Sequence, residues 1–171
     1  MLHGGDLCYA LVLPCDRFAR QEAYGQICGW LQQAMAALGE GLAFGSEPAD
    51  GSADCFARST AADLVQANGA KRIGSAQRWQ RGWLLQHGSI QLSPPGGMWR
   101  ALLDSAPPPP LAPAVDPGMV ADQLLHSARM RWSLPAAARP LDAALLADAG
   151  AQLERYRVVS TSPLASIART T

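Results

Sequence analysis

Three short segments separated by two glycine-containing turns occupy residues 63–92, and they constrain the fold more than any other part of the sequence. The first two segments, Asp63–Gln66 and Lys71–Gly74, flank an Asn-Gly pair, which adopts the positive φ angles of a tight hairpin turn. A second turn around residues 78–82 leads to the third segment, Trp83–Leu92. Because short turns join antiparallel neighbours, the pattern predicts a three-stranded meander whose second strand begins at Lys71.

The region upstream of the meander predicts one further strand and one long helix. Leu7–Leu13 is nearly continuous in apolar residues and is followed by Pro14, which is typical of a buried strand with both faces covered. Apolar residues then recur every three or four positions from Asp16, which can cap a helix, to Gly39, which can end it. Residues 39–54 predict an irregular loop with at most a brief strand at 42–44.

The last part of the chain predicts helices on either side of a stiff spacer. A short helix at Met98–Leu103 precedes a proline-rich segment at 107–113, which favours polyproline II. Two helices follow, roughly at Gly118–Ser127 and Leu141–Arg155. We therefore expect a core at residues 1–104, a spacer at 105–117 and a C-terminal helical extension at 118–171.

The composition is that of a globular protein with little surface charge. Of the 171 residues 49% are apolar and 16% are charged, and the formal net charge is zero, so no overall field favours nucleic acid or an anionic membrane as a partner. The four cysteines form no C-x-x-C pair, and we expect no metal site. The apolar run at 7–13 is too short to be a secretory or membrane-spanning segment, so we expect a cytoplasmic protein.

A single lysine, Lys71, stands among thirteen arginines. A coding bias toward arginine has no reason to spare one position, whereas a site that fits a compact ammonium often rejects the wide, planar guanidinium. Lys71 is therefore a candidate functional residue. The alternative is a lysine that survived by chance on a solvated turn, and counting alone favours neither interpretation.

Small residues follow Lys71 on the predicted strand. Gly74, Ser75 and Ala76 leave a smooth groove in which an acyl chain can approach the backbone closely. The ammonium can stabilise negative charge that develops on a carbonyl oxygen. Cys55 can attack that carbonyl if a nearby cation favours its thiolate, although an unpaired cysteine is more often a small buried apolar residue.

Two motifs occur in a characteristic order in the centre of the chain. The run Asn68-Gly69-Ala70-Lys71-Arg72-Ile73-Gly74-Ser75-Ala76-Gln77 is followed on the next segment by Gln86-His87-Gly88-Ser89-Ile90. Cys55-Phe56 and Asp63-Leu64-Val65 precede both runs. With this order and spacing the sequence resembles the lipoate–protein ligase A and octanoyltransferase family, from about His3 to Leu92.

The resemblance implies an α+β fold like that of the biotin and lipoate protein ligase catalytic domain, with a mixed, largely antiparallel sheet packed by helices on one side. It also implies that Lys71 binds the acyl carbonyl and that Cys55 is the catalytic nucleophile. Seven residues would bind the substrate: His3, Gly74, Ser75, Ala76, Gln77, His87 and Gly88. On spacing alone, His87 would instead be a hydrogen-bonded structural group.

Three functions are consistent with the resemblance. The leading one transfers an octanoyl group from acyl carrier protein, through a Cys55 thioester, to the lysine of a lipoyl domain, without any cofactor. Such domains belong to 2-oxoacid dehydrogenase subunits, and the glycine cleavage H protein is the related acceptor. The second function is ATP-dependent lipoate–protein ligation, which uses ATP and magnesium and leaves Cys55 incidental. The third is a noncatalytic remnant that still binds a lipoyl domain or acyl carrier protein.

The family's arginine- and glycine-rich loop, which precedes the histidine matched by His3, has no counterpart in the sequence. We therefore expect an N-terminally truncated catalytic core, which is either a fragment of a longer product or a reduced descendant. In both cases the strand at Leu7–Leu13 is expected to be partly exposed, which is a stability liability.

Three arginines, Arg72, Arg78 and Arg81, lie close in sequence to Trp79 and Trp83 around the second turn. Solvated arginines beside core tryptophans are the simpler interpretation. The functional alternative is a local positive face that docks an acidic carrier protein. Binding of single-stranded nucleic acid could use the same residue types, but the neutral overall charge argues against it.

Overall fold

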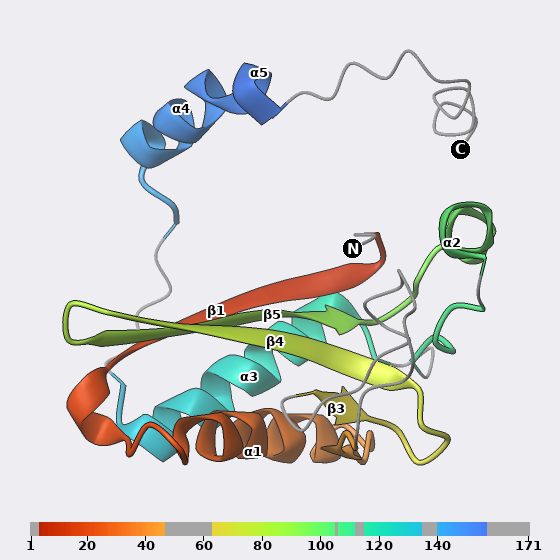
Figure 1. Cartoon of the computed structure of the whole chain (residues 1–171), viewed down its shortest axis with the longest axis horizontal. Helices are drawn as coiled ribbons and strands as arrows, with labels where there is room; N and C mark the ends of the chain where they lie inside the picture. The colour runs from red at the N-terminus through yellow and green to blue at the C-terminus, as the bar shows by residue number, and fades with distance from the viewer. Residues whose placement is uncertain (1–3, 47–62, 105, 112–114, 135–139, 157–171) are drawn as a thin grey trace. The chain divides into compact units, whose positions relative to one another are not determined.

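The computed structural model describes residues 4–46, 63–104, 106–111, 115–134 and 140–156. The predicted site residues His3 and Cys55 lie outside these ranges. The chain consists of two compact units, Met1–Leu134 and Pro135–Thr171. Each unit is considered by itself, and the first contains the sheet shown in Figure 1.

A five-stranded sheet forms the centre of the first unit, and every neighbouring pair of strands is antiparallel. In spatial order its strands are β1 (Asp6–Pro14), β5 (Trp83–Gln91), β4 (Lys71–Gln80), β3 (Leu64–Val65) and β2 (Ala43–Phe44). The predicted α+β fold class is therefore confirmed, as is the meander formed by β3, β4 and β5.

The two predicted turns have the backbone geometry that their glycines favour. Gly69 has a φ of 81° in the turn between β3 and β4. Arg81 and Gly82, with φ angles of 51° and 80°, form the two-residue connection between β4 and β5. Two successive positive φ angles suit the right-handed twist of a tight hairpin, and β4 continues well beyond the predicted end at Gly74.

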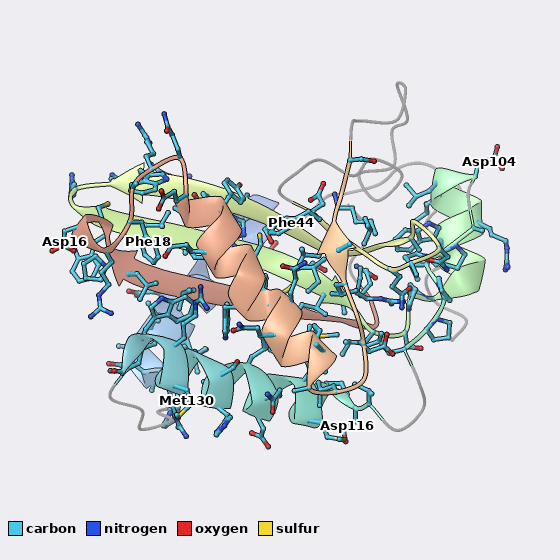
Figure 2. All side chains as sticks on the ribbon, turned by 90° about the horizontal axis from the view of Figure 1, so that it is seen from below. Asp16, Phe18, Phe44, Asp104, Asp116 and Met130 are labelled. Atoms are coloured by element: carbon cyan, nitrogen blue, oxygen red, sulfur yellow. The ribbon has the colours of Figure 1, made fainter. Side chains whose placement is uncertain are left out.

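Helices α1 (Ala23–Ala36) and α3 (Pro117–Trp132) cover one face of the sheet (Figure 1). Figure 2 looks onto this side, where α1 is drawn obliquely across the strands. Trp30 of α1 packs edge-on against Tyr9 of the sheet and Trp132 of α3, with ring centroids 6.0 and 5.3 Å apart. Its indole N–H donates to the Ser127 hydroxyl at 2.8 Å, so one aromatic residue ties both helices to the sheet.

Two predictions for the N-terminal region are wrong. The strand β1 is not covered on both faces, because Leu11 and Leu13 are buried whereas Val12 is 56% exposed. The helix begins at Ala23 and not at Asp16, which lies in a short 3₁₀ turn, η1 (Cys15–Arg17). The Cys15 N–H donates to the Gly82 carbonyl across the sheet end, and this long-range bond holds η1 against the hairpin instead of in a helix.

The proline-rich segment is packed against the sheet over the residues that the structure describes. It follows α2 (Gly96–Leu103), and both Pro108 and Leu111 are buried. The Leu111 N–H donates to the Leu92 carbonyl at 2.7 Å. The first unit continues through α3 to Leu134, whereas we expected the C-terminal extension to begin at residue 118.

The second unit contains α4 (Ala143–Ala151) and α5 (Leu153–Tyr156). A single helix was predicted over Leu141–Arg155, and the chain instead breaks at Gln152. Asp142 caps α4 by accepting from the Ala144 N–H at 2.8 Å. Among the described residues, no helix combines the length and apolar character needed to span a bilayer.

Candidate functional site

The two faces of the sheet differ in what covers them. Side chains alternate along each strand, and residues paired across neighbouring strands share a face. Tyr9, Gly88 and Ser75 form one such row on the side of α1, while Ala10, His87 and Ala76 form the next row on the opposite side. We call this opposite side the open face, because Ala10, Ala76 and His87 are all exposed.

A cavity of about 380 Å³ lies on the open face. Its volume is within the range of about 300–1,000 Å³ that small-molecule sites occupy. Side chains of the open-face rows form its floor, together with backbone of the intervening residues. The lining residues are Cys8, Tyr9, Asp63, Lys71, Gly74, Ser75, Ala76, His87, Gly88 and Ser89.

A β-bulge brings Lys71 to this cavity. Leu64 pairs with Ile73 but Val65 pairs with Lys71, so β4 contains one extra residue, Arg72, between the two pairs. In a regular strand Lys71 and Gly74 would point to opposite faces, since they are three residues apart. Here the Lys71 side chain lies over Gly74: a Cβ added at Gly74 would be 3.0 Å from the lysine Cε and 3.4 Å from Nζ.

Lys71 forms an ion pair at the edge of the cavity. Its Nζ lies 3.1 Å from Oδ2 of Asp63, and the two side chains are only 10% and 6% exposed. Burial weakens the screening of such a pair by water and salt. The carboxylate therefore restricts where the ammonium lies, and the absence of a side chain at Gly74 leaves the space in which it lies.

A second polar group lies on the open face at the end of β1. Oδ2 of Asp6 accepts from the Ser89 hydroxyl at 2.6 Å and contacts the Cys8 thiol at 3.7 Å. Oδ1 of Asp6 accepts from the Gly4 N–H at 2.9 Å. Burial and the nearby Asp6 carboxylate raise the pKa of the Cys8 thiol, so this cavity cysteine is disfavoured as a thiolate.

On the helix-covered face a chain of hydrogen bonds runs directly beneath the cavity. The Tyr9 and Ser75 hydroxyls are 2.7 Å apart, and the Gln86 amide donates to the Tyr9 oxygen at 3.0 Å. The side-chain N–H of Gln77 donates to the side-chain oxygen of Gln86 at 2.7 Å. Burial raises the pKa of Tyr9 to about 12 although its hydrogen bonds act in the opposite direction, so Tyr9 remains protonated near neutral pH.

Gly88 makes this chain geometrically feasible. Tyr9 is on β1 and Ser75 is on β4, so the tyrosine ring must cross the middle strand, β5, to reach the serine. It crosses at Gly88, where an added Cβ would lie 2.8 Å from the ring Cε1 and 2.3 Å from the Gly74 carbonyl oxygen. The glycine is therefore required by packing on the helix side, whatever its role on the open face.

The structure brings together most of the predicted site residues that it describes. Lys71, Gly74, Ala76 and His87 meet at the cavity from the open face. Ser75 and Gly88 line it as well, but the Ser75 hydroxyl is bonded to Tyr9 on the other side of the sheet.

Gln77 does not line the cavity. Its side-chain N–H donates to the Gln86 side chain on the helix-covered face, and its side-chain oxygen accepts from the Trp79 indole N–H at 3.3 Å. The predicted positions His3 and Cys55 fall outside the described residues.

Four cavity residues were not predicted as site residues from the sequence: Cys8, Tyr9, Asp63 and Ser89. Pairing the predicted strands could have identified Cys8 and Ser89. Gly74 pairs with Ser89, and Ser89 pairs with Cys8, so all three share a face. The position of Asp63 beside Lys71 depends on the bulge, for which the sequence contains no clear signal.

Solved structures with the same fold have been described as lipoate–protein ligases. A putative lipoate protein ligase from T. acidophilum matches with a TM-score of 0.69 and 14% identity over 88% of this chain and 61% of its own. A structure of the same protein with bound lipoic acid has the same TM-score at 16% identity over 88% and 61% of the two chains. A lipoate-protein ligase A bound with ATP matches at 0.67 and 15% identity over 88% and 62%.

This chain therefore spans about three fifths of the length of these proteins. The TM-scores show a shared fold, the α+β fold of these lipoate–protein ligases. A comparison with curated proteins gave no match. Residues 1–95 match the Biotin/lipoate A/B protein ligase family, and the chain belongs to this family.

Proposed function

We propose that this protein acts in protein lipoylation, binding an acyl group in the Lys71 cavity and delivering it to the lysine of a lipoyl domain. The observation that carries the proposal is the position of Lys71, whose ammonium enters a cavity with a floor of small side chains. Family membership and the lipoic acid bound to a T. acidophilum relative support it. Lipoyl domains of 2-oxoacid dehydrogenases and the glycine cleavage H protein are the proposed acceptors.

In this proposal Lys71 donates a hydrogen bond to the acyl carbonyl oxygen. The ammonium stabilises the negative charge that develops on that oxygen during attack, while Asp63 holds the lysine in place. The Gly74 and Ala76 positions and His87 line the path of the acyl chain.

The leading route is octanoyl transfer through Cys55. The Cys55 thiolate attacks the thioester carbonyl of octanoyl–acyl carrier protein, the carrier thiolate leaves and takes a proton, and an octanoyl thioester forms on Cys55. The acceptor lysine amine then attacks this thioester, an amide forms, the amine loses a proton and the Cys55 thiolate is released. The route requires neither ATP nor a metal ion.

The second candidate is ATP-dependent lipoate ligation. It is favoured by the solved structures that share the fold, since their descriptions are of lipoate–protein ligases and one has ATP bound. Lys71 keeps its role in this route, because a cation beside the carbonyl also suits a phosphate ester. Among the described residues, no group of three or more histidine, cysteine, aspartate or glutamate side chains forms a metal site for magnesium.

Mass spectrometry separates these routes. After incubation with octanoyl–acyl carrier protein, the transferase gains one octanoyl group, and Cys55→Ser abolishes the gain. Cys8→Ser is the matched control, because Cys8 lies in the cavity but has a raised pKa. Modification of a lipoyl domain only with free lipoate and ATP would establish the ligase. A protein that binds the domain and modifies nothing would be a noncatalytic remnant, and the proposed function would be wrong.

A further inference from the structure

The open face continues beyond the cavity toward the β4–β5 turn, and this extension is apolar. Val12, Leu85 and Arg78 form one row across β1, β5 and β4, and Trp83 belongs to the next row. Val12 is 56% exposed and Trp83 is 52% exposed. Exposed apolar side chains that adjoin on one sheet face are a frequent mark of an interaction site.

Basic side chains border this apolar area. Arg78 is exposed within it, and Arg81 is exposed in the turn at its end. The open-face rows from Ala10 to Pro14 contain no carboxylate. Asp16 of η1, which the Cys15–Gly82 hydrogen bond holds at this end of the sheet, is followed directly by Arg17.

We call the set Val12, Arg78, Arg81, Trp83 and Leu85 the hairpin platform, in which all but the half-buried Leu85 are exposed. The overall charge of the chain is zero, so the positive charge here is a local property of the surface. An interface core of tryptophan and aliphatic side chains with arginine around it is the composition that protein partners favour over other parts of a surface.

The platform is on the same face as the cavity and close to it. Arg78 and Gly74 are four residues apart on β4, which is about 13 Å at ~3.3 Å per residue of extended strand. His87 and Ala76 lie between the two in the register. A protein domain that covers the platform could therefore reach the Lys71 cavity with a single extended side chain.

We propose that the hairpin platform docks a small acidic protein domain that presents a lysine to the Lys71 cavity. The inference rests on the proposed function, which makes this domain the lipoyl domain acceptor. Arg78 and Arg81 attract its acidic surface and set its orientation, and Trp83 with Val12 provides the apolar contact. A positive platform on a neutral protein selects for acidic partners without a general affinity for polyanions.

The test measures binding of the full chain to an unmodified lipoyl domain by isothermal titration calorimetry, at low salt and at ~0.3 M salt, where screening is strong. Arg78→Glu should weaken binding about tenfold at low salt, because a charge that attracts the partner becomes one that repels it. Trp83→Ala should also weaken binding, and this effect should persist at high salt. Arg100→Glu on α2 is the matched control, since it reverses an exposed arginine away from the platform.

A second measurement separates failure of the platform from failure of the proposed function. Octanoyl-pantetheine, a thioester without a carrier protein, should load wild type and Arg78→Glu equally. If the protein is loaded and Arg78→Glu binds the lipoyl domain as tightly as the wild type, the platform is overturned and the proposed function is kept. Domain binding that depends on Arg78, without any loading, would keep the platform and remove the transferase route.

The remaining outcomes contradict the platform. An equal loss of binding in Arg100→Glu would indicate attraction without a defined surface. Absence of domain binding by the wild type would also overturn the inference. The inference would also be overturned if phosphatidylglycerol vesicles or single-stranded DNA bound in a manner that depends on Arg78, while the lipoyl domain did not bind in that manner.

Discussion

The position of Lys71 depends on what surrounds it as much as on the residue itself. Asp63 fixes the ammonium from one side, and Gly74 provides the space through which the side chain passes. The arrangement explains why a lysine is retained in a chain that otherwise uses arginine. A guanidinium is wider than an ammonium and would need more room than the stem of Lys71 leaves above Gly74.

Gly74→Ala tests this arrangement. The new Cβ would lie 3.0 Å from Lys71 Cε, so the flexible lysine side chain must move by a few tenths of an ångström. We expect a change of less than about 1 kcal/mol in the free energy of unfolding, because the side chain can adjust. Acyl transfer should fall about tenfold, since small displacements of a catalytic group are costly. The measurements are urea unfolding and transfer kinetics.

Gly97→Ala is the matched control for that experiment. It lies within α2 and an added Cβ there meets nothing within 4 Å. Alanine should raise helix stability by up to about 1 kcal/mol and leave transfer unchanged. If Gly74→Ala transferred at the wild-type rate, the lysine stem would not need the space above Gly74.

The buried thiol of Cys28 makes stability depend on pH in the alkaline range. Burial raises its pKa from 9.0 to about 11, although the Gln86 amide opposes the shift. The folded state therefore holds the thiol proton more tightly than the unfolded state, and stability is lost as pH rises from about 9 to about 11. The loss should be on the order of 2 kcal/mol.

Urea unfolding at pH about 8 and about 10.5 measures this loss, and Cys28→Ala should reduce it. Some loss should remain in the variant, because burial also raises the pKa of Tyr9 to about 12. The slope with pH is compared, not the absolute stability, since the substitution also removes packing. An equally steep decline in Cys28→Ala would show that the thiol does not contribute.

At the scale of elements, Arg72 joins three segments that are far apart in sequence. Its guanidinium is fully buried and donates to the Gln91 carbonyl, the Gln66 side-chain oxygen and the Pro109 carbonyl, each at 2.6–2.7 Å. Gln66 in turn donates to Glu40 at 3.2 Å. The bulge that places Lys71 therefore contains an arginine that ties the proline-rich segment to β5 and to the β3–β4 turn.

Arg72→Met should destabilise the first unit by about 3 kcal/mol, because three acceptors lose a charged donor and none of them gains water easily. Hydrogen exchange should increase most at the Leu111 amide, which bonds Leu92 beside this contact. Arg100→Met, at an exposed site, should change stability by less than about 0.5 kcal/mol. Equal stability of the two variants would contradict the role given to Arg72.

The elements could be predicted where local pattern decides them, and not where long-range contacts do. The Asn-Gly turn, the meander and α3 follow from short-range signals. The start of α1 does not, since the Cys15–Gly82 bond competes with the capping tendency of Asp16. The sequence did contain the information that excludes Gln77 from the cavity. Side chains alternate along a strand, so a run of four residues cannot present every side chain to one groove.

At the scale of the whole molecule, the first unit holds the sheet, α1, α3 and the buried apolar cluster. The buried residues of this cluster all lie between Leu11 and Trp132, within the first unit. The stability of the sheet should therefore not depend on the second unit. The sequence could not reveal this division, because the contact of α3 with α1 joins residues far apart in the chain.

A shortened chain that ends at Leu134 tests the independence of the first unit. It should unfold cooperatively, with a melting temperature within a few degrees of the full chain, because the core residues are retained. Circular dichroism and differential scanning calorimetry measure both properties. A broad, non-cooperative transition would mean that the second unit contributes to the core.

The single extra residue in β4 has a consequence for how relatives are recognised. Lys71 precedes Gly74 by three residues, so a chain with the same spacing but no bulge would turn its amine toward the helices, with no change in composition. The pairing register across this interval thus carries as much information as the identity of the lysine. Alignments that match the lysine alone would group chains whose amines face opposite sides of the sheet.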